Sequence, residues 1–411
     1  MNPVRSTHMN ILQINTADIR GGAAKVAYRF GKELEKEGHG SVLLVSRKYS
    51  LDDNVVPIRP YNDFKRRLLK KLTYYLANDI DLFHSDHILK MNEFKKADII
   101  HCHNLHSNYF NLKTLIKISA SKPVIWTFHD MWPITAHCAH SFDGALKNSG
   151  FFTCPSLEIY PPIAWHNEKY LEKIKEQVYS KSNFHIVTPS KWLADKVGQS
   201  TLANKPITVI YNGIDTNIFK SLSKDQSRDE LGLPQDKKII LIVAKRGQSN
   251  PWKGGNYFQN IVNKYKHRND ICFIDLGGIK EDDSMPNLKI VPYINDEKVM
   301  AKYYSASDIL LYPSIADNCP LVVLEAQACG LPVLSFNTGG ISELVEHKKT
   351  GYIAGYKKSE ELSAGLEFLL SLPDHELKSM RNSSSIGASQ NFSLELMAQK
   401  YLELYSSILY D

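Results

Sequence analysis

The feature that most constrains the fold is a regular alternation of short apolar runs with amphipathic stretches. The run "NILQINT" (10–16) is followed by "AAKVAYRFGKELEKEG" (23–38), in which apolar residues recur every three or four positions. A second series of the same kind opens at "ITVIYNGID" (207–215) and continues through "KIILIVAK" and "ICFIDLGG". Strands that alternate with helices in this way predict parallel sheets covered by helices on both faces. The predicted fold class is therefore α/β.

The length of 411 residues is more than one ordinary core needs and suits two domains. The stretch "GQSTLANKP" (198–206) separates the two series, so we predict a first domain over 9–200 and a second over 206–392. The segment 393–411 is an amphipathic helix that needs a partner surface, which either domain could supply by letting the helix cross back. Residues 1–8, "MNPVRSTH", are polar and patternless, and we interpret them as an upstream extension or a cloning remnant.

Composition narrows the class of protein. Hydrophobic residues make up 43% of the chain, yet no window approaches the ~20 apolar residues of a membrane span. With no export signal, we expect a cytoplasmic protein whose six scattered cysteines are reduced thiols. Residues 1–205 hold 28 lysines and arginines against 19 acidic residues. This basic half is either a solvated surface or one that faces anionic lipid or phosphorylated ligands.

Two glycine-containing turns are candidate phosphate sites. In "INTADIRGGAAK" a strand runs into Gly21-Gly22 and then a helix, whose first amides favour an anion. The pattern is not G-x-G-x-x-G, which disfavours a nicotinamide-dependent oxidoreductase. In "VAKRGQSNPWKGG", Arg246 and Lys253 follow a strand and would suit a diphosphate, or they form a solvated basic loop.

The stretch "PSIADNCPLVVLEAQACGLPV" combines a loop with a helix start. If the helix begins near Pro320, the amides of Leu321 and Val322 lie in its first turn and can bind phosphate. Glu325 then lies about one turn inside the helix, where a carboxylate could accept two ribose hydroxyls.

Several stretches together resemble a known family. They are "DNCPLVVLEAQACGLPV", "NTGGISELVEHKKTGYI", "VIYNGIDTNIF", "TPSKWLADKV" and the N-terminal strand followed by "GGAA" and a helix. In this order they resemble the group-1 glycosyltransferases, retaining enzymes of the GT-B architecture, and the likeness extends from Met9 over nearly the whole chain. The resemblance implies two Rossmann-like domains that face each other across a cleft. It also implies transfer of a sugar from a nucleoside diphosphate donor without a metal or other cofactor.

The resemblance implies roles for the acidic and basic residues. The family has an E-x7-E motif, whose second acid, here Glu325, binds the donor ribose. The first acid lies beside the transferred sugar, and here that position is Asp317, one methylene shorter. A basic pair that holds the diphosphate corresponds to Lys253 and Arg246, although the family usually spaces the two more closely.

The remaining donor contacts are implied in the same way. The amides of Leu321 and Val322 and the Gly21-Gly22 turn would complete the phosphate site, and Asn318 belongs to the same loop as Asp317. Two further positions, Pro292 and Tyr293 in "VPYI", correspond to the place where the family holds the nucleobase.

The "FHD" sequence contains a candidate catalytic histidine. By its own chemistry, a histidine at a strand end is more often structural. The resemblance instead places His129 near the donor sugar, and the adjacent Asp130 would either orient its imidazole or cap the following turn.

Three other patterns suggest metals, and we interpret all three as metal-free. Asp79-Ile-Asp81 matches D-x-D but has no strand before it, which favours ordinary loop charge. "HCHNLHS" has three histidines, His101, His103 and His106, but we expect alternate residues at a strand end to point to opposite faces, which disfavours one shared metal.

The third pattern is "HCAHSFDGALKNSGFFTCP". Some relatives with "HDMWPIT" have four cysteines in this region, which suggests structural zinc. Here Cys138 and Cys154 match two of those positions, and the others correspond to about Gly144 and Phe151, which cannot bind zinc. We therefore predict a metal-free loop near the acceptor.

A basic amphipathic stretch, "FKRRLLKKLTYYL" (64–76), has two interpretations. It is either a helix packed on its own domain or an interfacial helix that docks on an anionic membrane, where lipid-linked acceptors reside.

The sequence as a whole predicts a retaining, metal-independent glycosyltransferase of the hexosyltransferase type. Its partners would be a nucleotide-sugar donor and a saccharide or lipid-linked acceptor, with no nucleic acid. Family habit places it in surface polysaccharide biosynthesis (capsule or lipopolysaccharide), in the cytoplasm or peripherally at the inner face of the membrane. Two alternatives remain open: a non-catalytic nucleotide-sugar-binding homologue, because of Asp317, and a nucleotide-sugar epimerase of the same fold.

Overall fold

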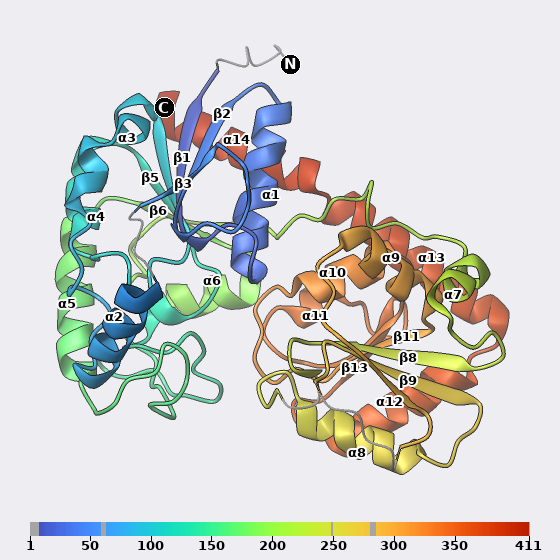
Figure 1. The fold of residues 1–411 in the computed structure, drawn as a ribbon. Coiled ribbons are helices and arrows are strands. Elements are labelled where there is room, and N and C mark those ends of the chain that lie inside the picture. The colour runs from blue at the N-terminus through green and yellow to red at the C-terminus, as the bar shows by residue number, and fades with distance from the viewer. Residues whose placement is uncertain (1–7, 59–62, 248–249, 280–284, 411) are drawn as a thin grey trace. The chain divides into compact units, whose positions relative to one another are not determined.

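The computed structural model describes residues 8–58, 63–247, 250–279 and 285–410. The chain forms two compact units, of which the first comprises Met1–Tyr211 with Met397–Asp411 and the second Asn212–Leu396. Each unit is built on a parallel sheet flanked by helices (Figure 1). The predicted α/β class with two such units is confirmed. Of the predicted upstream extension, residues 1–7 lie outside the described part of the chain.

The sheet of the first unit has seven strands in the order β3-β2-β1-β4-β5-β6-β7. Every neighbouring pair is parallel. The strands are β1 (Asn10–Ala17), β2 (Gly40–Arg47), β3 (Val55–Pro57), β4 (Ile99–Cys102), β5 (Val124–Thr127), β6 (His185–Thr188) and β7 (Ile207–Val209).

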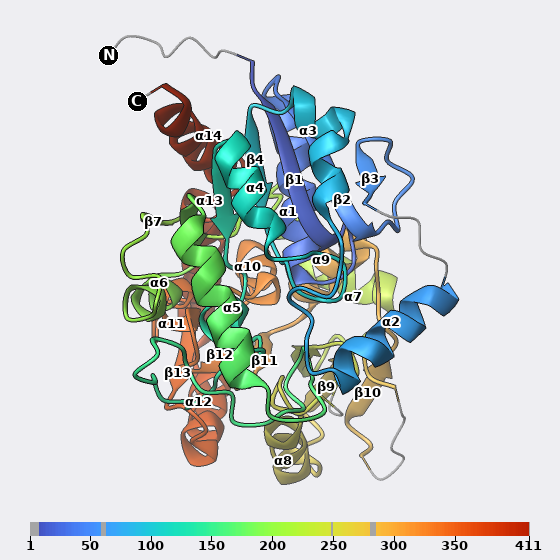
Figure 2. The same cartoon turned by 90° about the vertical axis from the view of Figure 1, so that its left-hand side faces the viewer.

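The helices of this unit cover both faces of its sheet. They are α1 (Gly22–Lys36), α2 (Asp63–Tyr75), α3 (Asn92–Lys96), α4 (Thr114–Ser121), α5 (Glu168–Lys181), α6 (Lys191–Gly198) and α14 (Leu394–Tyr410), with the 3-10 turns η1 (Asp86–Lys90) and η2 (Trp132–Ile134). Figure 2 shows α4 and α5 side by side, whereas α1 covers the opposite face (Figure 1). Odd-numbered residues of β1 face α1, and even-numbered residues such as Leu12 and Ile14 enter the core under α4 and α5.

The final helix returns to the first unit, as the fold prediction allowed. The rings of Tyr401 on α14 and Phe30 on α1 are 4.7 Å apart. The hydroxyl of Tyr405 lies 2.6 Å from Nδ1 of His101 on β4, and both residues are fully buried. Buried polar and aromatic contacts thus hold α14 on the α1 face of the sheet.

The sheet of the second unit has six strands in the order β10-β9-β8-β11-β12-β13. They are β8 (Lys238–Val243), β9 (Ile271–Leu276), β10 (Leu288–Val291), β11 (Ile309–Tyr312), β12 (Val333–Phe336) and β13 (Gly351–Ala354). The helices are α7 (Lys224–Leu231), α8 (Gly255–Tyr265), α9 (Glu297–Ala306), α10 (Leu321–Ala328), α11 (Ile341–Leu344), α12 (Ser359–Ser371) and α13 (Asp374–Asn391). The central strands are continuous apolar runs because helices cover both of their faces.

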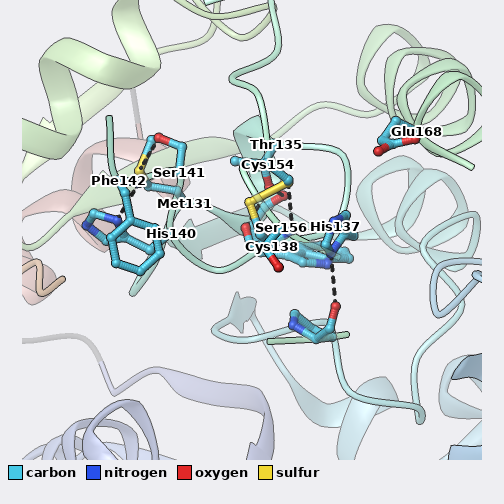
Figure 3. The surroundings of a disulfide bond; sticks show 12 residues. Met131, Thr135, His137, Cys138, His140, Ser141, Phe142, Cys154, Ser156 and Glu168 are labelled. Carbon is cyan, nitrogen blue, oxygen red and sulfur yellow. Dashed lines mark hydrogen bonds between the residues drawn. A yellow bond between two sulfur atoms is a disulfide. The ribbon is translucent and has the colours of Figure 1, made fainter. Parts of the chain in front are cut away.

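The expectation that all cysteines are reduced is wrong for one pair. Cys138 and Cys154 form a disulfide in the segment between η2 and α5, with a Cα–Cα distance of 5.9 Å (Figure 3). Their spacing in the sequence does not show that the loop between them folds back, and only this folding brings the two Cα atoms within bonding range. The other four cysteines are free thiols.

The histidines that flank the disulfide bind other groups. Nδ1 of His137 lies 3.0 Å from the carbonyl oxygen of Pro161, and Nδ1 of His140 accepts from the amide of Phe142 at 2.9 Å. Figure 3 shows His137 beside the sulfur atoms and His140 farther from them. Across the described ranges, no three His, Cys, Asp or Glu side chains are grouped so that they could hold a metal ion. In the same part of the chain, each helix is too short or too polar to cross a bilayer.

Candidate functional site

The loop that follows β8 carries Lys253 and the loop that follows β11 carries Asp317, and the two side chains are in contact. The ammonium of Lys253 is hydrogen-bonded and ion-paired to the carboxylate of Asp317, and it lies 3.2 Å from the hydroxyl of Tyr312. The same hydroxyl donates to Asp317. Burial would lower the pKa of Lys253, but Asp317 and Tyr312 raise it above its ordinary value, so the ammonium stays charged. Burial and Asp317 likewise raise the pKa of Tyr312.

Two glycines allow this close approach. Gly254 has a φ of 75° and caps α8, and a Cβ there would lie 1.8 Å from the carbonyl oxygen of Pro313. Gly339 has a φ of 55°, and a Cβ there would lie 1.7 Å from the carbonyl oxygen of Asp317. A side chain at either position would require both a left-handed backbone and a displaced loop. These glycines therefore hold the Lys253 and Asp317 loops against their neighbours.

The helix α10 begins one residue later than predicted, because Pro320 is its N-cap and not its first helical residue. The amides of Leu321 and Val322 have no acceptor within the helix, since they belong to its first turn. The preceding loop is held by hydrogen bonds, from the Gly340 amide to the Asn318 carbonyl (3.0 Å) and from the Asn212 side chain to the Cys319 carbonyl (2.9 Å).

Glu325 lies on α10 and is 6% exposed. Its Oε2 accepts a hydrogen bond from the hydroxyl of Tyr304 on α9 at 3.2 Å. A buried carboxylate held by a tyrosine is oriented before any ligand arrives. Sequence reasoning missed both Tyr304 and Tyr312, because an aromatic residue in a helix or strand is ordinarily read as core.

Three other predicted donor-binding residues of the second unit also follow the carboxyl ends of strands in its sheet. Arg246 is exposed after β8 and has a φ of 72°. The residues that separate it from Lys253 include 248–249, which lie outside the described part of the chain. Pro292 and Tyr293 are exposed at the end of the edge strand β10.

In the first unit, Gly21 and Gly22 form the predicted turn at the start of α1. Gly21 is the N-cap with a φ of 107°, and both glycines are exposed. A Cβ at either position would meet nothing within 4 Å, and the first turn of α1 holds no acidic side chain. The backbone amides of this turn lie at the positive end of the helix dipole.

His129 follows β5 and contacts His103, which follows the neighbouring strand β4. Its Nε2 lies 2.9 Å from Nδ1 of His103, whose Nε2 lies 2.9 Å from Oε1 of Gln13. Burial lowers the pKa of His129 to about 4, although the charge of Asp130 opposes this shift. Asp130 itself accepts from the amide of Trp132 (2.9 Å), which is the predicted capping of the following turn, and it pairs with His106 (3.0 Å).

Two predictions for the first unit are corrected. His101 and His103 do not point to opposite faces, since residues two apart on a strand share a face, and their ring centroids are 4.2 Å apart. Asp79 is not a solvated loop charge, because it is 4% exposed and burial raises its pKa. Asp81, two residues further on, pairs with Lys113 at 2.7 Å. Solvation of a loop residue depends on what packs over it, which its local sequence does not show.

Two family models match the chain. The model of Glycosyltransferase Family 4 matches residues 20–218, and that of Glycosyl transferases group 1 matches residues 223–385. Among curated relatives, WcaC of Escherichia coli K12, assigned as a colanic acid biosynthesis glycosyl transferase, is 24% identical over 82% of this chain and 85% of its own length. The D-inositol 3-phosphate glycosyltransferase of Mycolicibacterium smegmatis is also 24% identical, over 75% and 68%.

Solved structures show the same fold at low identity. Sucrose-phosphate synthase from Thermosynechococcus elongatus has a TM-score of 0.69 at 16% identity, covering 98% of this chain and 99% of that one. The Anabaena protein HepE, in complex with UDP-glucose, has a TM-score of 0.65 at 16% identity, covering 97% and 100%. With both of its halves matched by these models, the chain belongs to the group 1 glycosyltransferases of the GT-B fold, with a family 4 domain preceding the group 1 domain.

Proposed function

We propose that this glycosyltransferase is a retaining, metal-independent enzyme that transfers a hexose from a nucleoside diphosphate donor to a saccharide acceptor. The observation that supports this most strongly is the arrangement at one edge of the second sheet. A charged Lys253, the Asp317 carboxylate, the first turn of α10 and the buried Glu325 all follow neighbouring strands there.

Each group matches one part of a nucleotide sugar. Glu325 would accept the ribose hydroxyls, and the amides of Leu321 and Val322 with Lys253 would bind the diphosphate. Asn318 and Arg246 would add contacts from the flanking loops, and Pro292 and Tyr293 would face the base. Because HepE was solved with UDP-glucose, uracil is the first base to test.

The chemistry would depend on positive charge placed at the leaving group. As the glycosidic bond breaks, negative charge develops on the diphosphate, and Lys253 with the α10 amides would stabilise it. Asp317 is paired with Lys253 in the absence of donor, and it would contact the transferred sugar once the donor is bound. A donor phosphate oxygen would act as the base for an acceptor hydroxyl that enters from the same face, so that the anomeric configuration is retained.

The first unit would supply two further contacts. The exposed N-terminus of α1 at Gly21-Gly22 would bind an anionic group, and His129 would contact the donor sugar. The acceptor is proposed from the relatives: WcaC is assigned to colanic acid biosynthesis, which supports a role in surface polysaccharide assembly such as capsule or lipopolysaccharide.

We also propose that α2 docks on an anionic membrane surface, where a lipid-linked acceptor would be held. Phe64 and Tyr75 are 76% and 67% exposed, and Leu68 and Leu72 between them are about half exposed. These residues recur at helical spacing, and the exposed Lys70 and Lys71 add positive charge. An exposed apolar stripe with flanking lysines is typical of interfacial helices. Replacing Phe64 and Leu68 together with serine should abolish co-sedimentation with vesicles of anionic lipid; unchanged binding would refute the docking.

A thermal-shift panel with UDP, GDP, ADP and their sugars tests donor binding. A nucleotide at a hundredfold excess over its Kd stabilises the protein by about 2.7 kcal/mol, which separates the correct base from the others. Analysis of the products formed from the best-binding donor then distinguishes three outcomes. A glycosylated acceptor with retained configuration supports the proposal, whereas an isomerised donor formed without acceptor indicates an epimerase. Binding without turnover in both wild type and Asp317→Ala indicates a non-catalytic homologue.

A further inference from the structure

A line of buried side chains connects three neighbouring strands of the first unit to His129. Gln13 on β1 is fully buried and lies in register with His101 on β4. His103, just beyond the end of β4, continues the ladder by donating its amide to Ile14. Because β1, β4 and β5 are adjacent and parallel, Gln13 in the middle of β1 reaches His103 just past the end of β4, and His103 reaches His129 just past the end of β5.

The hydrogen bonds along this line have a direction. Nε2 of Gln13 donates to the hydroxyl of Ser41 at 3.1 Å, so its Oε1 faces Nε2 of His103 as an acceptor. His103 must therefore carry its proton on Nε2, which leaves Nδ1 as its acceptor nitrogen. The contact of 2.9 Å to that Nδ1 is then donated by Nε2 of His129. In a neutral ring with its proton on Nε2, Nδ1 of His129 is the acceptor.

The surroundings keep both rings neutral. Burial lowers the pKa of His103 well below its usual range, and the neighbouring His101 and His129 lower it further. Around His129, Asp130 favours protonation and His106 opposes it. From α14, Tyr405 and Tyr401 contribute hydroxyls to His101 and Thr127, and burial raises the pKa of both tyrosines.

The helix α1 is adapted to this line. Gly31 lies in the middle of α1, where glycine is normally unfavourable by roughly 1 kcal/mol relative to alanine. A Cβ at Gly31 would lie 2.8 Å from Nε2 of Gln13 and 3.0 Å from Oγ of Ser41. The absent side chain thus leaves room for the amide of Gln13 and for the hydroxyl that orients it.

We propose that Gln13 and His103 are positioning residues that hold His129 as the tautomer protonated on Nε2, so that its Nδ1 accepts a hydrogen bond from a hydroxyl of the transferred sugar. This inference rests on the proposed contact of His129 with that sugar. It assigns a function to two residues that the sequence patterns did not single out as site residues and that touch no substrate themselves.

The tautomer is tested directly by long-range ¹H–¹⁵N spectra of wild-type protein labelled with ¹⁵N-histidine, with His129 assigned by its loss in His129→Asn. We expect a protonated Nε2 and a bare Nδ1 at neutral pH. A His129 protonated on Nδ1 would overturn the inference without any assay of activity, so this result is independent of the donor.

Two substitutions at Gln13 test the consequence for catalysis. Gln13→Met keeps the side-chain volume but removes the hydrogen-bond acceptor of His103. We expect the rate of nucleoside diphosphate release to fall about tenfold, which is equivalent to the loss of one neutral hydrogen bond. The donor in this assay is UDP-glucose, or the nucleotide sugar of the panel that stabilises the protein most. The KM for donor should change little. Thr127→Val is the matched control, because it removes a buried hydrogen bond to His101 and leaves the line through His103 intact.

Gln13→Glu gives a readout that a purely structural role would not move. A carboxylate facing Nε2 of His103 raises the pKa of His103, and a protonated His103 must donate from Nδ1, which forces His129 onto the other tautomer. We therefore expect the acid limb of the pH–rate profile to move to higher pH in Gln13→Glu and to stay unchanged in Thr127→Val. Equal profiles in all three proteins would refute the positioning role. If His129→Asn retains full turnover, the proposed contact of His129 with sugar fails instead, whatever the spectra show.

Discussion

Replacing Gly339 with alanine tests whether close packing of the Asp317 loop against the backbone of Gly339 is needed for sugar transfer. A Cβ at Gly339 would lie 1.7 Å from the carbonyl oxygen of Asp317, whereas real Cβ contacts essentially never fall below 3.0 Å. The two loops would therefore have to separate by about 1.3 Å. Because a misplacement of about 1 Å in an active site can cost about 100-fold in rate, we expect kcat for sugar transfer to fall by about that factor.

Gly232 supplies a matched control for backbone strain. It has a φ of 59°, close to the 55° of Gly339, but a Cβ there would meet nothing within 4 Å. Gly232→Ala should lose about 1 kcal/mol of unfolding free energy through the left-handed backbone alone, with unchanged kcat. Gly339→Ala should lose several kcal/mol, because the strained backbone and the displaced loop both contribute.

Urea unfolding measures the first quantity and donor turnover the second. If Gly339→Ala and Gly232→Ala lose the same stability and both keep the wild-type kcat, then contact with Gly339 does not determine the geometry of the Asp317 loop. That result would refute the prediction that displacement of the Asp317 loop slows sugar transfer.

Three further predictions follow from single contacts. Lys253→Met should raise the Kd of the best-binding nucleotide by about tenfold or more in calorimetric titration, because a charge-assisted hydrogen bond to phosphate is lost; an unchanged Kd would remove Lys253 from the diphosphate site. Burial lowers the pKa of Lys175 from 10.5 to about 7, so the unfolded chain binds more protons than the folded protein between these pH values. The contribution of Lys175 to the free energy of unfolding should therefore rise with pH from about 7 to 10.5, and Lys175→Met should lack this rise. Parallel curves of stability against pH for the two proteins would contradict this. Cys138→Ser should lose about 3 kcal/mol of unfolding free energy, and a reductant should lower wild type to the same level, whereas Cys272→Ser, at a free thiol, should leave the response to reductant intact.

The candidate site could be predicted from sequence only where its determinants are local. The sequence predicts the start of α10 to within one residue, because Pro320 and the apolar run after it are neighbours in the chain. It predicts the strand-to-helix turn at Gly21 for the same reason. By contrast, the burial of Asp79 depends on residues far along the chain, and its local sequence resembles a solvated loop.

The pairings within the site were outside the reach of the sequence patterns. Lys253 and Asp317 are 64 positions apart, and Gln13 and His103 are 90 apart. A periodicity shows that a side chain faces a core or solvent, but it does not show which side chain from another strand will meet it. The same limit applies to Cys138 and Cys154, whose closeness depends on the folding of the intervening loop.

By itself, the sequence determined the two α/β series and the strand ends after which chemistry-bearing residues lie, because spacing along the chain encodes burial and backbone conformation. Only the tertiary structure decided that Asp317 shares Lys253 with Tyr312, that His129 is held through His103 by Gln13, and that α14 packs against His101. The first two contacts join loops or strands that the order of a parallel sheet brings together, and the third depends on where α14 packs on a face of the sheet. That order arises from packing the whole chain, and no local stretch of residues specifies it.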